Sequence, residues 1–442
     1  MKINVPRSLA AWTVMGVLLY AYMTTFQTVL WGSRSGGVLY VIILTMMVLL
    51  VNLKKLIKVD SASTGRFFWI ALALLSCFNN QDMRFDSQSR WILPMCGIII
   101  MIALKGRYEW QSYFIKTVRF FTGIHAFFTI FFYVFKGLYL NAFVKLIPGA
   151  GVYLISKFND GCMPGITGHY STNGIYLGIG FVFFANDLIT KNYNSQNKKI
   201  KAVCKALFVL LALVLTTKRA HILFGVIVCF AIYYFYNSDK KVSRWFYIIG
   251  AVIGLAALVI IMAPIIPAVG NMVNRFVNAD GGELSNGRIW FWEFALEKFR
   301  QSPVFGIGWG GFKHYYHMRI GDYSSTGTTV DAHNVYLQIL CEMGIVGFVV
   351  FLCAVSTTFK TTWSTLKRVC KNKRKYSNRV INELTLSIGM QVFFVLYCFT
   401  GNCLYDCEFF FVYAISCAMA FNKAETLKEI ISDEKNRNTN LS

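Results

Sequence analysis

The apolar residues of this chain are gathered into long blocks, which short charged stretches separate. A transmembrane helix needs about 20 consecutive, mostly apolar residues. The pattern therefore predicts an all-α polytopic membrane protein with about twelve transmembrane helices. The predicted spans cover residues 9–30, 36–53, 67–79, 91–104, 114–135, 172–188, 203–217, 220–236, 245–263, 335–357, 384–401 and 408–422.

The composition supports this class. Of the 442 residues, 56% are apolar and only 15% are charged, whereas a soluble domain carries about 25% charged residues. The mean hydropathy is +0.50, which excludes a disordered chain and an ordinary cytosolic enzyme. We expect residues 1–442 to form a single integral membrane domain.

The net charge of +23 raises the question of nucleic-acid binding, and the positions of the charges answer it. With the N-terminus inside, 30 of the 44 Lys and Arg residues fall in inward segments. This bias follows the positive-inside rule and predicts that both termini are cytoplasmic, including a tail at 423–442. No basic stripe lies on a soluble face, so we expect membrane lipid and not nucleic acid as a partner.

Two predicted outward loops are long, at 136–171 and 264–334, and loops of this length are usually functional or disordered. The second contains the helical stretch RIWFWEFALEKFRQ, which Ser285 or Asn286 can cap and Pro303 ends. Its apolar positions are too many for one stripe, so we interpret it as an interfacial helix. The following GIGWGG matches the letters of a dinucleotide fingerprint, but no strand precedes it, and a tight turn is the better interpretation.

A block of short motifs within 286–350 resembles the O-antigen ligase and Wzy-type polysaccharide polymerase superfamily. Thr217-Lys218-Arg219, at a short turn between two spans, resembles a second signature of that superfamily. One departure is Lys218, where relatives often carry a small residue. The block consists of Asn286-Gly287-Arg288, Trp290, Pro303-x-x-Gly306-x-Gly308, Ala332-His333-Asn334-x-Tyr336-Leu337 and Glu342-x-Gly344-x-x-Gly347.

The resemblance implies a GT-C-like glycosyltransferase of the bacterial plasma membrane, with its active site on the outer side. It implies metal-independent, inverting transfer of a glycan from undecaprenyl diphosphate, without a cofactor. We expect a polymerase that uses a second carrier-linked repeat unit as acceptor, in surface polysaccharide, O-antigen or capsule biosynthesis. The alternatives are a ligase with a lipid A core or other acceptor, and a transporter or flippase. Chain-length regulator and flippase proteins are the expected protein partners.

The residue chemistry agrees with glycosyl transfer. Arg219 and Arg288 lie in predicted outward segments, where their guanidinium groups would hold the diphosphate and neutralise the leaving group. His333, at the outer mouth of a span, is the predicted base for the acceptor hydroxyl. Asp331 is close to it in sequence and is a candidate to orient it.

Three further residues are weaker candidates for the site: His169 as a competing base, Lys218 beside Arg219, and Glu342 as an acid within a span. Tyr170 and Asn173 are candidate sugar contacts. No metal site is expected, because His314 and His317 are three residues apart but lack a third ligand nearby. A disulfide among Cys162, Cys403 and Cys407 is left open.

Overall fold

The computed structural model describes residues 5–56, 63–81, 90–104, 110–147, 151–237, 261, 263–264, 270, 288–320, 331–372 and 375–439. The described residues are almost entirely helical, which confirms the all-α class. The N-terminal helices are α1 (Val5–Tyr22), η1 (Thr24–Phe26), α2 (Gln27–Trp31), α3 (Arg34–Leu56), α4 (Ser63–Phe78), α6 (Ile92–Ala103), α7 (Trp110–Val134), α8 (Lys136–Asn141), η2 (Phe143–Leu146) and α9 (Gly151–Asn159). The later helices are α10 (Tyr170–Thr190), α11 (Gln196–Leu215), α12 (Arg219–Tyr236), α15 (Arg288–Gln301), α16 (Gly311–Ile320), α17 (Val335–Lys371), α18 (Asn378–Cys398) and α19 (Cys407–Thr439).

Ten of the twelve predicted spans each coincide with one helix of the structure, and the first is divided among α1, η1 and α2. The predicted span at 245–263 lies almost entirely outside the described residues, as does the proposed helix cap at Ser285 or Asn286. By length and apolar composition, six described helices can cross a membrane, or seven if a bent pair counts as one span. These helices indicate a polytopic membrane protein, and the count of twelve remains a prediction.

The first predicted span, 9–30, is wrong as a single straight helix. The axis bends by 79° between Leu9–Tyr22 and Thr24–Trp31. A side chain from α10 binds the backbone at the bend, because the Tyr176 hydroxyl donates to the carbonyl of Ala21. The Thr25 hydroxyl, at the bend itself, accepts from the backbone N–H of Gly168. Such insertion into the helical hydrogen-bond ladder is a recognised cause of kinks, and apolar pattern alone does not reveal it.

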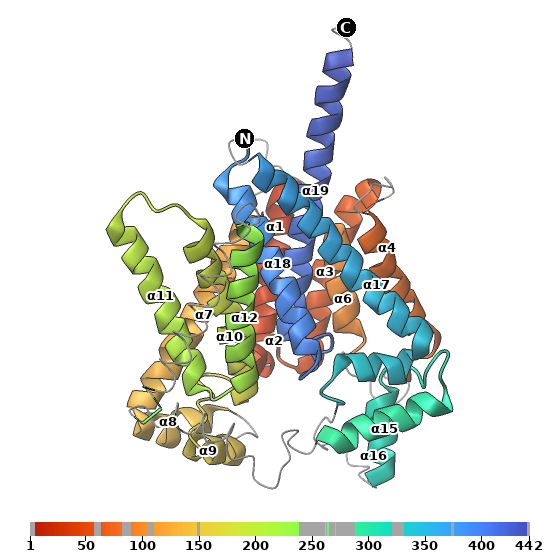
Figure 1. Cartoon of the computed structure of the whole chain (residues 1–442). Coiled ribbons are helices and arrows are strands. Elements are labelled where there is room, and N and C mark those ends of the chain that lie inside the picture. The colour runs from red at the N-terminus through yellow and green to blue at the C-terminus, as the bar shows by residue number, and fades with distance from the viewer. Residues whose placement is uncertain are drawn as a thin grey trace.

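The helices form a bundle whose two ends differ (Figure 1). The short helices α8 and α9 and the loop helices α15 and α16 gather at one end, and the N-terminus and the far end of α19 lie at the other. Helix α15 spans the residues RIWFWEFALEKFRQ, as the sequence predicts, whereas α8, α9 and α16 were not predicted. All of the candidate site residues except Glu342 lie in or next to the connections at the first end.

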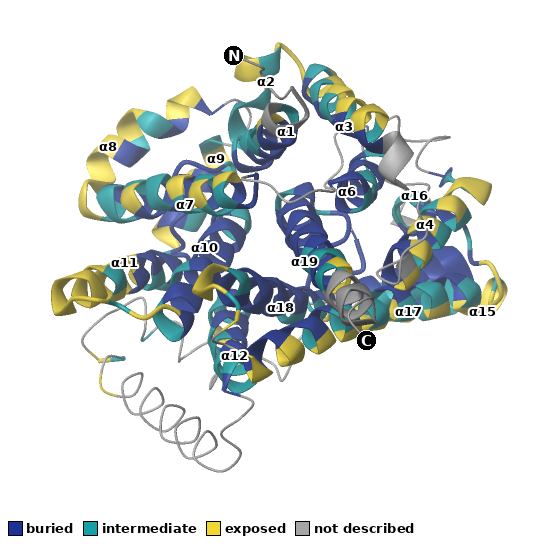
Figure 2. Cartoon of the chain, turned by 90° about the horizontal axis from the view of Figure 1, so that it is seen from above, coloured by how far each residue is buried: buried dark blue, intermediate teal, exposed yellow. Residues whose placement is uncertain are grey.

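The most deeply buried helices lie in the middle of the bundle (Figure 2). In α10 and α18, 78% of the most apolar window is buried, compared with 28% in α3 and α12. Helix α19 is buried from Phe409 to Phe421 on every side. A helix that is apolar all round and buried all round is a core helix, so α10, α18 and α19 form the scaffold and α3 and α12 face outward.

The longest transmembrane helix, α17, is broken at Gly344, which has φ 64° and ψ −167°. The turn that carries the GIGWGG sequence packs into this break. Backbone N–H groups of Ile307 and Gly308 donate to the carbonyls of Cys341 and Glu342 at 3.0 and 2.8 Å, and Ile345 donates back to the carbonyl of Pro303 at 2.9 Å. Backbone hydrogen bonds therefore hold the GIGWGG turn against the break in α17, and we call this contact the interlock.

Glycine is required on both sides of this interlock. A Cβ atom added at Gly306 would lie 2.3 Å from the carbonyl carbon of Glu342, and one added at Gly344 would lie 2.3 Å from the carbonyl oxygen of Val304. Both residues also have positive φ, which other residues rarely adopt. Gly306 of the GIGWGG turn thus permits a close backbone contact with α17.

Candidate active site

His333 lies at the start of α17 in a constrained segment. Its φ is 49°, a left-handed conformation that costs free energy for a residue other than glycine. The segment is held on both sides: Asn334 caps α17 by accepting from the N–H of Leu337 at 3.1 Å, and the indole of Trp292 donates to the carbonyl of Ala332 at 3.0 Å. The imidazole is therefore projected from a fixed backbone at the end of a helix.

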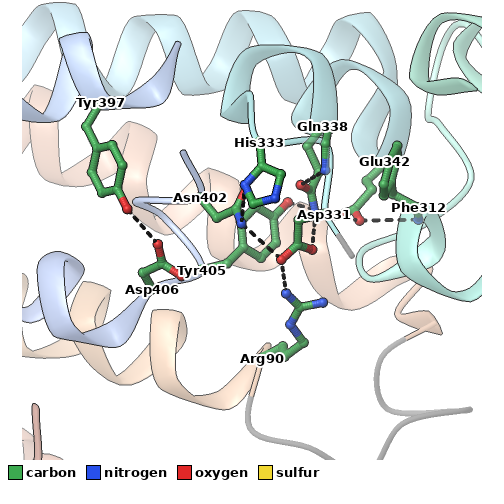
Figure 3. A network of polar contacts seen from close by, with 11 residues as sticks. Arg90, Phe312, Asp331, His333, Gln338, Glu342, Tyr397, Asn402, Tyr405 and Asp406 are labelled. Carbon is green, nitrogen blue, oxygen red and sulfur yellow. Dashed lines mark hydrogen bonds and ion pairs between the residues drawn. The ribbon is translucent and has the colours of Figure 1, made fainter. Parts of the chain in front are cut away.

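Asp331 is the centre of a buried polar network (Figure 3). Its carboxylate is 4% exposed and forms an ion pair with Arg90, which lies between α4 and α6. The side-chain amides of Gln338 and Asn402 donate to its two oxygens, each at 3.2 Å. A buried carboxylate is stable only when its charge is paired and its lone pairs are satisfied, and Asp331 meets both conditions.

Asn402 links this carboxylate to the histidine. Its amide nitrogen is 3.2 Å from Oδ2 of Asp331 and 3.5 Å from Nδ1 of His333. Asp331 therefore orients His333 through one intervening amide, and does not contact it directly. The long second distance positions the ring without a strong hydrogen bond.

Glu342, in α17, is fully buried and belongs to the same polar network. The amide of Gln338 donates to Oε1 at 3.3 Å, the backbone N–H of Phe312 donates to Oε1 at 3.3 Å, and the Tyr405 hydroxyl donates to Oε2 at 2.7 Å. These donors come from three separate segments. Glu342 thus links α16 and the α18–α19 connection to α17, and Gln338 joins it by hydrogen bonds to Asp331.

Two cations, Arg288 and Lys218, lie near His333, and in addition to burial they lower its pKa. Arg288, the first residue of α15, donates to the carbonyl of Thr400 at 3.0 Å. The ammonium of Lys218 lies 4.5 Å from the centre of the Tyr170 ring, a cation–π contact. In the part of the chain that the structure describes, neither residue pairs with a carboxylate. Half-buried cations without a carboxylate partner favour an anionic ligand.

The two cations act on each other and on the histidine. Burial, and then the charge of Arg288, lower the pKa of Lys218 to about 8. Burial and the charge of Arg288 also lower the pKa of His333 to about 4, against the opposing effect of Asp331. At neutral pH His333 is therefore uncharged and able to accept a proton.

The other predicted residues have different surroundings. Arg219 is the first residue of α12 and is half-buried beside Lys218. His169 caps α10: its Nδ1 accepts from the N–H of Ser171 at 3.0 Å, and its Nε2 lies 2.5 Å from the Tyr153 hydroxyl. Because both ring nitrogens are engaged, His169 is a poorer candidate for the base than His333.

Two remaining expectations concern neighbours of these residues. Asn173 is fully buried and donates to Thr129 and to the carbonyl of Met163, so its amide supports the core and is not open to a sugar. All twelve cysteines are free, including the three for which a disulfide was left open. Among the described residues, no three His, Cys, Asp or Glu side chains are grouped as metal ligands.

Sequence reasoning did not single out Arg90, Gln338, Asn402 or Tyr405. Arg90 is a cation in a predicted outward loop, and such residues are few, so it could have been noticed. Asn402 and Tyr405 follow α18 in a short connection, and their neutral side chains carry no distinctive signal. Their importance comes only from contacts over more than 60 positions in sequence.

A comparison with known families identifies one match. A model of the O-antigen ligase family matches residues 205–352, about a third of the chain. The match confirms the resemblance to the O-antigen ligase and Wzy-type polymerase superfamily, whose members are glycosyltransferase-like. It covers Lys218, Arg288 and His333, whereas Arg90 and Asn402 lie outside it. No curated protein matches the chain.

Proposed function

We propose that this protein is a polysaccharide polymerase that transfers a glycan from undecaprenyl diphosphate to a second carrier-linked repeat unit at the outer face of the bacterial plasma membrane. The observation that supports it best is the pair of cations Lys218 and Arg288, which have no carboxylate partner among the described residues and lie next to a neutral histidine. A diphosphate leaving group needs positive charge, and an acceptor hydroxyl needs a base.

The proposed reaction is a single displacement. The acceptor hydroxyl oxygen attacks the anomeric carbon, and the bond between that carbon and the diphosphate oxygen breaks. The electron pair leaves with the polyprenyl diphosphate, whose charge Lys218, Arg288 and Arg219 neutralise. The hydroxyl proton passes to His333, and one displacement inverts the anomeric configuration.

Substrate binding would improve the base. The pKa of the free His333 side chain is near 4, in part because Arg288 is close. A bound diphosphate neutralises that cation, so the pKa of His333 rises toward neutrality and proton transfer becomes more favourable. His333 then becomes an effective base only when the donor diphosphate is bound to the cations.

A ligase is the second candidate, because the matching family is described as O-antigen ligase. The two reactions share the donor and differ in the acceptor, so the same cations and histidine serve either. A transporter is less well supported: the charged candidates gather at one end of the bundle, and Glu342 is the only charged residue of α17 that is fully buried.

The test is reconstitution of the full-length protein with carrier-linked repeat units and analysis of products on a gel. A polymerase yields a ladder of longer carrier-linked chains, and EDTA leaves it unchanged. Product formation only after addition of lipid A core would replace the polymerase with the ligase. Absence of any new glycosidic bond with either acceptor, together with movement of the substrate across the vesicle, would establish transport.

The matched control for Arg288 is Lys157, a second cation at the same end of the bundle. Arg288→Gln should abolish elongation, whereas Lys157→Gln should leave it unchanged. Lys157 is paired with Asp160 at 2.9 Å on an exposed surface and is not part of the cluster. Equal activity of both variants would remove Arg288 from the site.

A further inference from the structure

Two buried cysteines, Cys398 and Cys403, touch at the end of the bundle that carries the candidate site. Cys398 is the last residue of α18, and Cys403 lies in the connection between α18 and α19. Both are thiols in the structure, and both side chains are fully buried. Their sulfur atoms are 3.2 Å apart. Because a disulfide bond is about 2.05 Å long, a movement of about 1 Å would join them.

The direction of the two side chains favours such a bond. Two cysteines whose side chains point apart cannot be joined without movement of the backbone, whereas these two sulfurs already face each other. The Cys403 thiol also lies 3.6 Å from the carbonyl oxygen of Phe394, which holds the connection against α18. Cys407, the first residue of α19, has a different contact, because its sulfur lies 3.5 Å from the carboxylate of Glu408.

The segment between the two cysteines contacts both halves of the proposed site. The carbonyl of Thr400 accepts from Arg288 at 3.0 Å, and the side-chain amide of Asn402 lies between Asp331 and His333. This one segment therefore supports both a proposed diphosphate-binding cation and the proposed base. A covalent bond between its two ends would reduce the number of conformations that it can adopt.

The expected surroundings of these thiols are oxidising. The function proposed above places this end of the bundle outside the cytoplasm, and the present inference rests on that function. Disulfides form and persist in extracytoplasmic compartments, whereas cytosolic thiols are kept reduced. The two thiols would therefore meet an oxidant during membrane insertion, before the connection packs and buries both sulfurs.

We propose that Cys398 and Cys403 form a disulfide in the mature protein, which holds the segment between them in place at the site. The oxidant is the disulfide of an exported thiol oxidoreductase. One cysteine thiolate attacks this disulfide and forms a mixed disulfide, which the second thiolate then attacks. The bond between Cys398 and Cys403 forms, the oxidant leaves as a dithiol, and the two thiol protons pass to its two sulfurs. Burial then protects the new bond from reductants.

The test of the bond is differential alkylation of the full-length protein. Cells are treated with N-ethylmaleimide in denaturant without reductant, and the protein is then purified, reduced and treated with iodoacetamide. Peptide mass spectrometry shows which reagent each cysteine carries. We expect the second reagent on Cys398 and Cys403 and the first reagent on Cys407. The first reagent on Cys398 and Cys403 would overturn the proposal.

Serine variants test which cysteines are paired. In Cys403→Ser the remaining partner, Cys398, should lose its protection and carry the first reagent. The matched control is Cys407→Ser, in which Cys398 and Cys403 should stay protected. Loss of protection in Cys407→Ser, or continued protection of Cys398 in Cys403→Ser, would mean that the bond joins other cysteines, and it would overturn the proposal.

Kinetics test the effect of the bond on the site. A double variant with Cys398→Ser and Cys403→Ser should elongate glycan with a kcat about tenfold lower than wild type, because small displacements of reacting groups are costly. Cys407→Ser should keep the wild-type kcat. A purely structural role of the bond would lower the yield of the double variant and leave the kcat of its folded fraction normal. That result would overturn the positioning role.

Alkylation requires no turnover, so this inference and the proposed function fail separately. Elongation by a protein in which both thiols are free would remove the disulfide and keep the polymerase. Protected cysteines in a protein that transfers no glycan would remove the polymerase and keep the disulfide.

Discussion

Asp331 and His333 are joined by the side-chain amide of Asn402, which lies 3.2 Å from the carboxylate and 3.5 Å from the imidazole. Two residues that are close in sequence are thus coupled through a third residue in the connection between α18 and α19. This arrangement makes Asn402 a positioning residue, and it separates the charge of the carboxylate from the ring that is expected to move a proton.

The first prediction concerns the base. His333→Ala should lower the rate of elongation by about 10²–10⁴-fold, the usual contribution of a general base, measured with purified protein of normal thermal stability. His169→Ala is the control, because its ring caps α10 and both its nitrogens are engaged. It should lower stability by about 1 kcal/mol and keep most of the activity. The opposite pattern would make His169 the base.

The second prediction concerns Asn402. Replacement by Leu removes the link between Asp331 and His333 and leaves the cations in place. We expect kcat to fall by about tenfold or more with little change in the KM of the donor, since a misplaced group affects the reaction and not the binding. A purely structural role would instead lower protein yield and leave the kcat of the folded fraction normal.

The third prediction is the pH dependence of kcat/KM, which reports the free enzyme. His333 must be neutral and its pKa is about 4, so activity is lost as pH falls through about 4. Lys218 must be charged and its pKa is about 8, so activity is lost as pH rises through about 8. In Lys218→Arg the alkaline limb should move upward, because guanidinium stays charged. An unchanged alkaline limb would exclude Lys218 from donor binding.

The fourth prediction concerns the interlocked backbones. Gly344→Ala places a Cβ atom 2.3 Å from the carbonyl oxygen of Val304 at a φ of +64°. We expect a loss of about 1–3 kcal/mol or more in stability, from strain and displacement of the turn, seen as a lower melting temperature. The matched control is Gly123→Ala in α7, where an added Cβ meets no atom within 4 Å. Equal melting temperatures for Gly344→Ala and Gly123→Ala would contradict the prediction, because the turn would then move aside with no loss of stability.

Much of the fold followed from local pattern. Apolar blocks predicted ten helices correctly. The helix of the long loop runs from Arg288 to Gln301 as predicted, and its end before Pro303 is a local signal. The bend after Tyr22 was missed, since it depends on the hydroxyl of Tyr176, about 150 residues further along the chain. The break at Gly344 was missed for the same reason.

By itself, the sequence determined the class of protein, the sidedness expected from its charges, and the residue types that suit glycosyl transfer. The tertiary structure alone decided which of those residues act together. It places Lys218 near Arg288 and His333. His169 caps a helix. Arg90 and Asn402 contact Asp331. The physical reason is that hydropathy is a property of each segment, whereas a buried charge is defined by partners that only the packed helices bring within hydrogen-bonding distance.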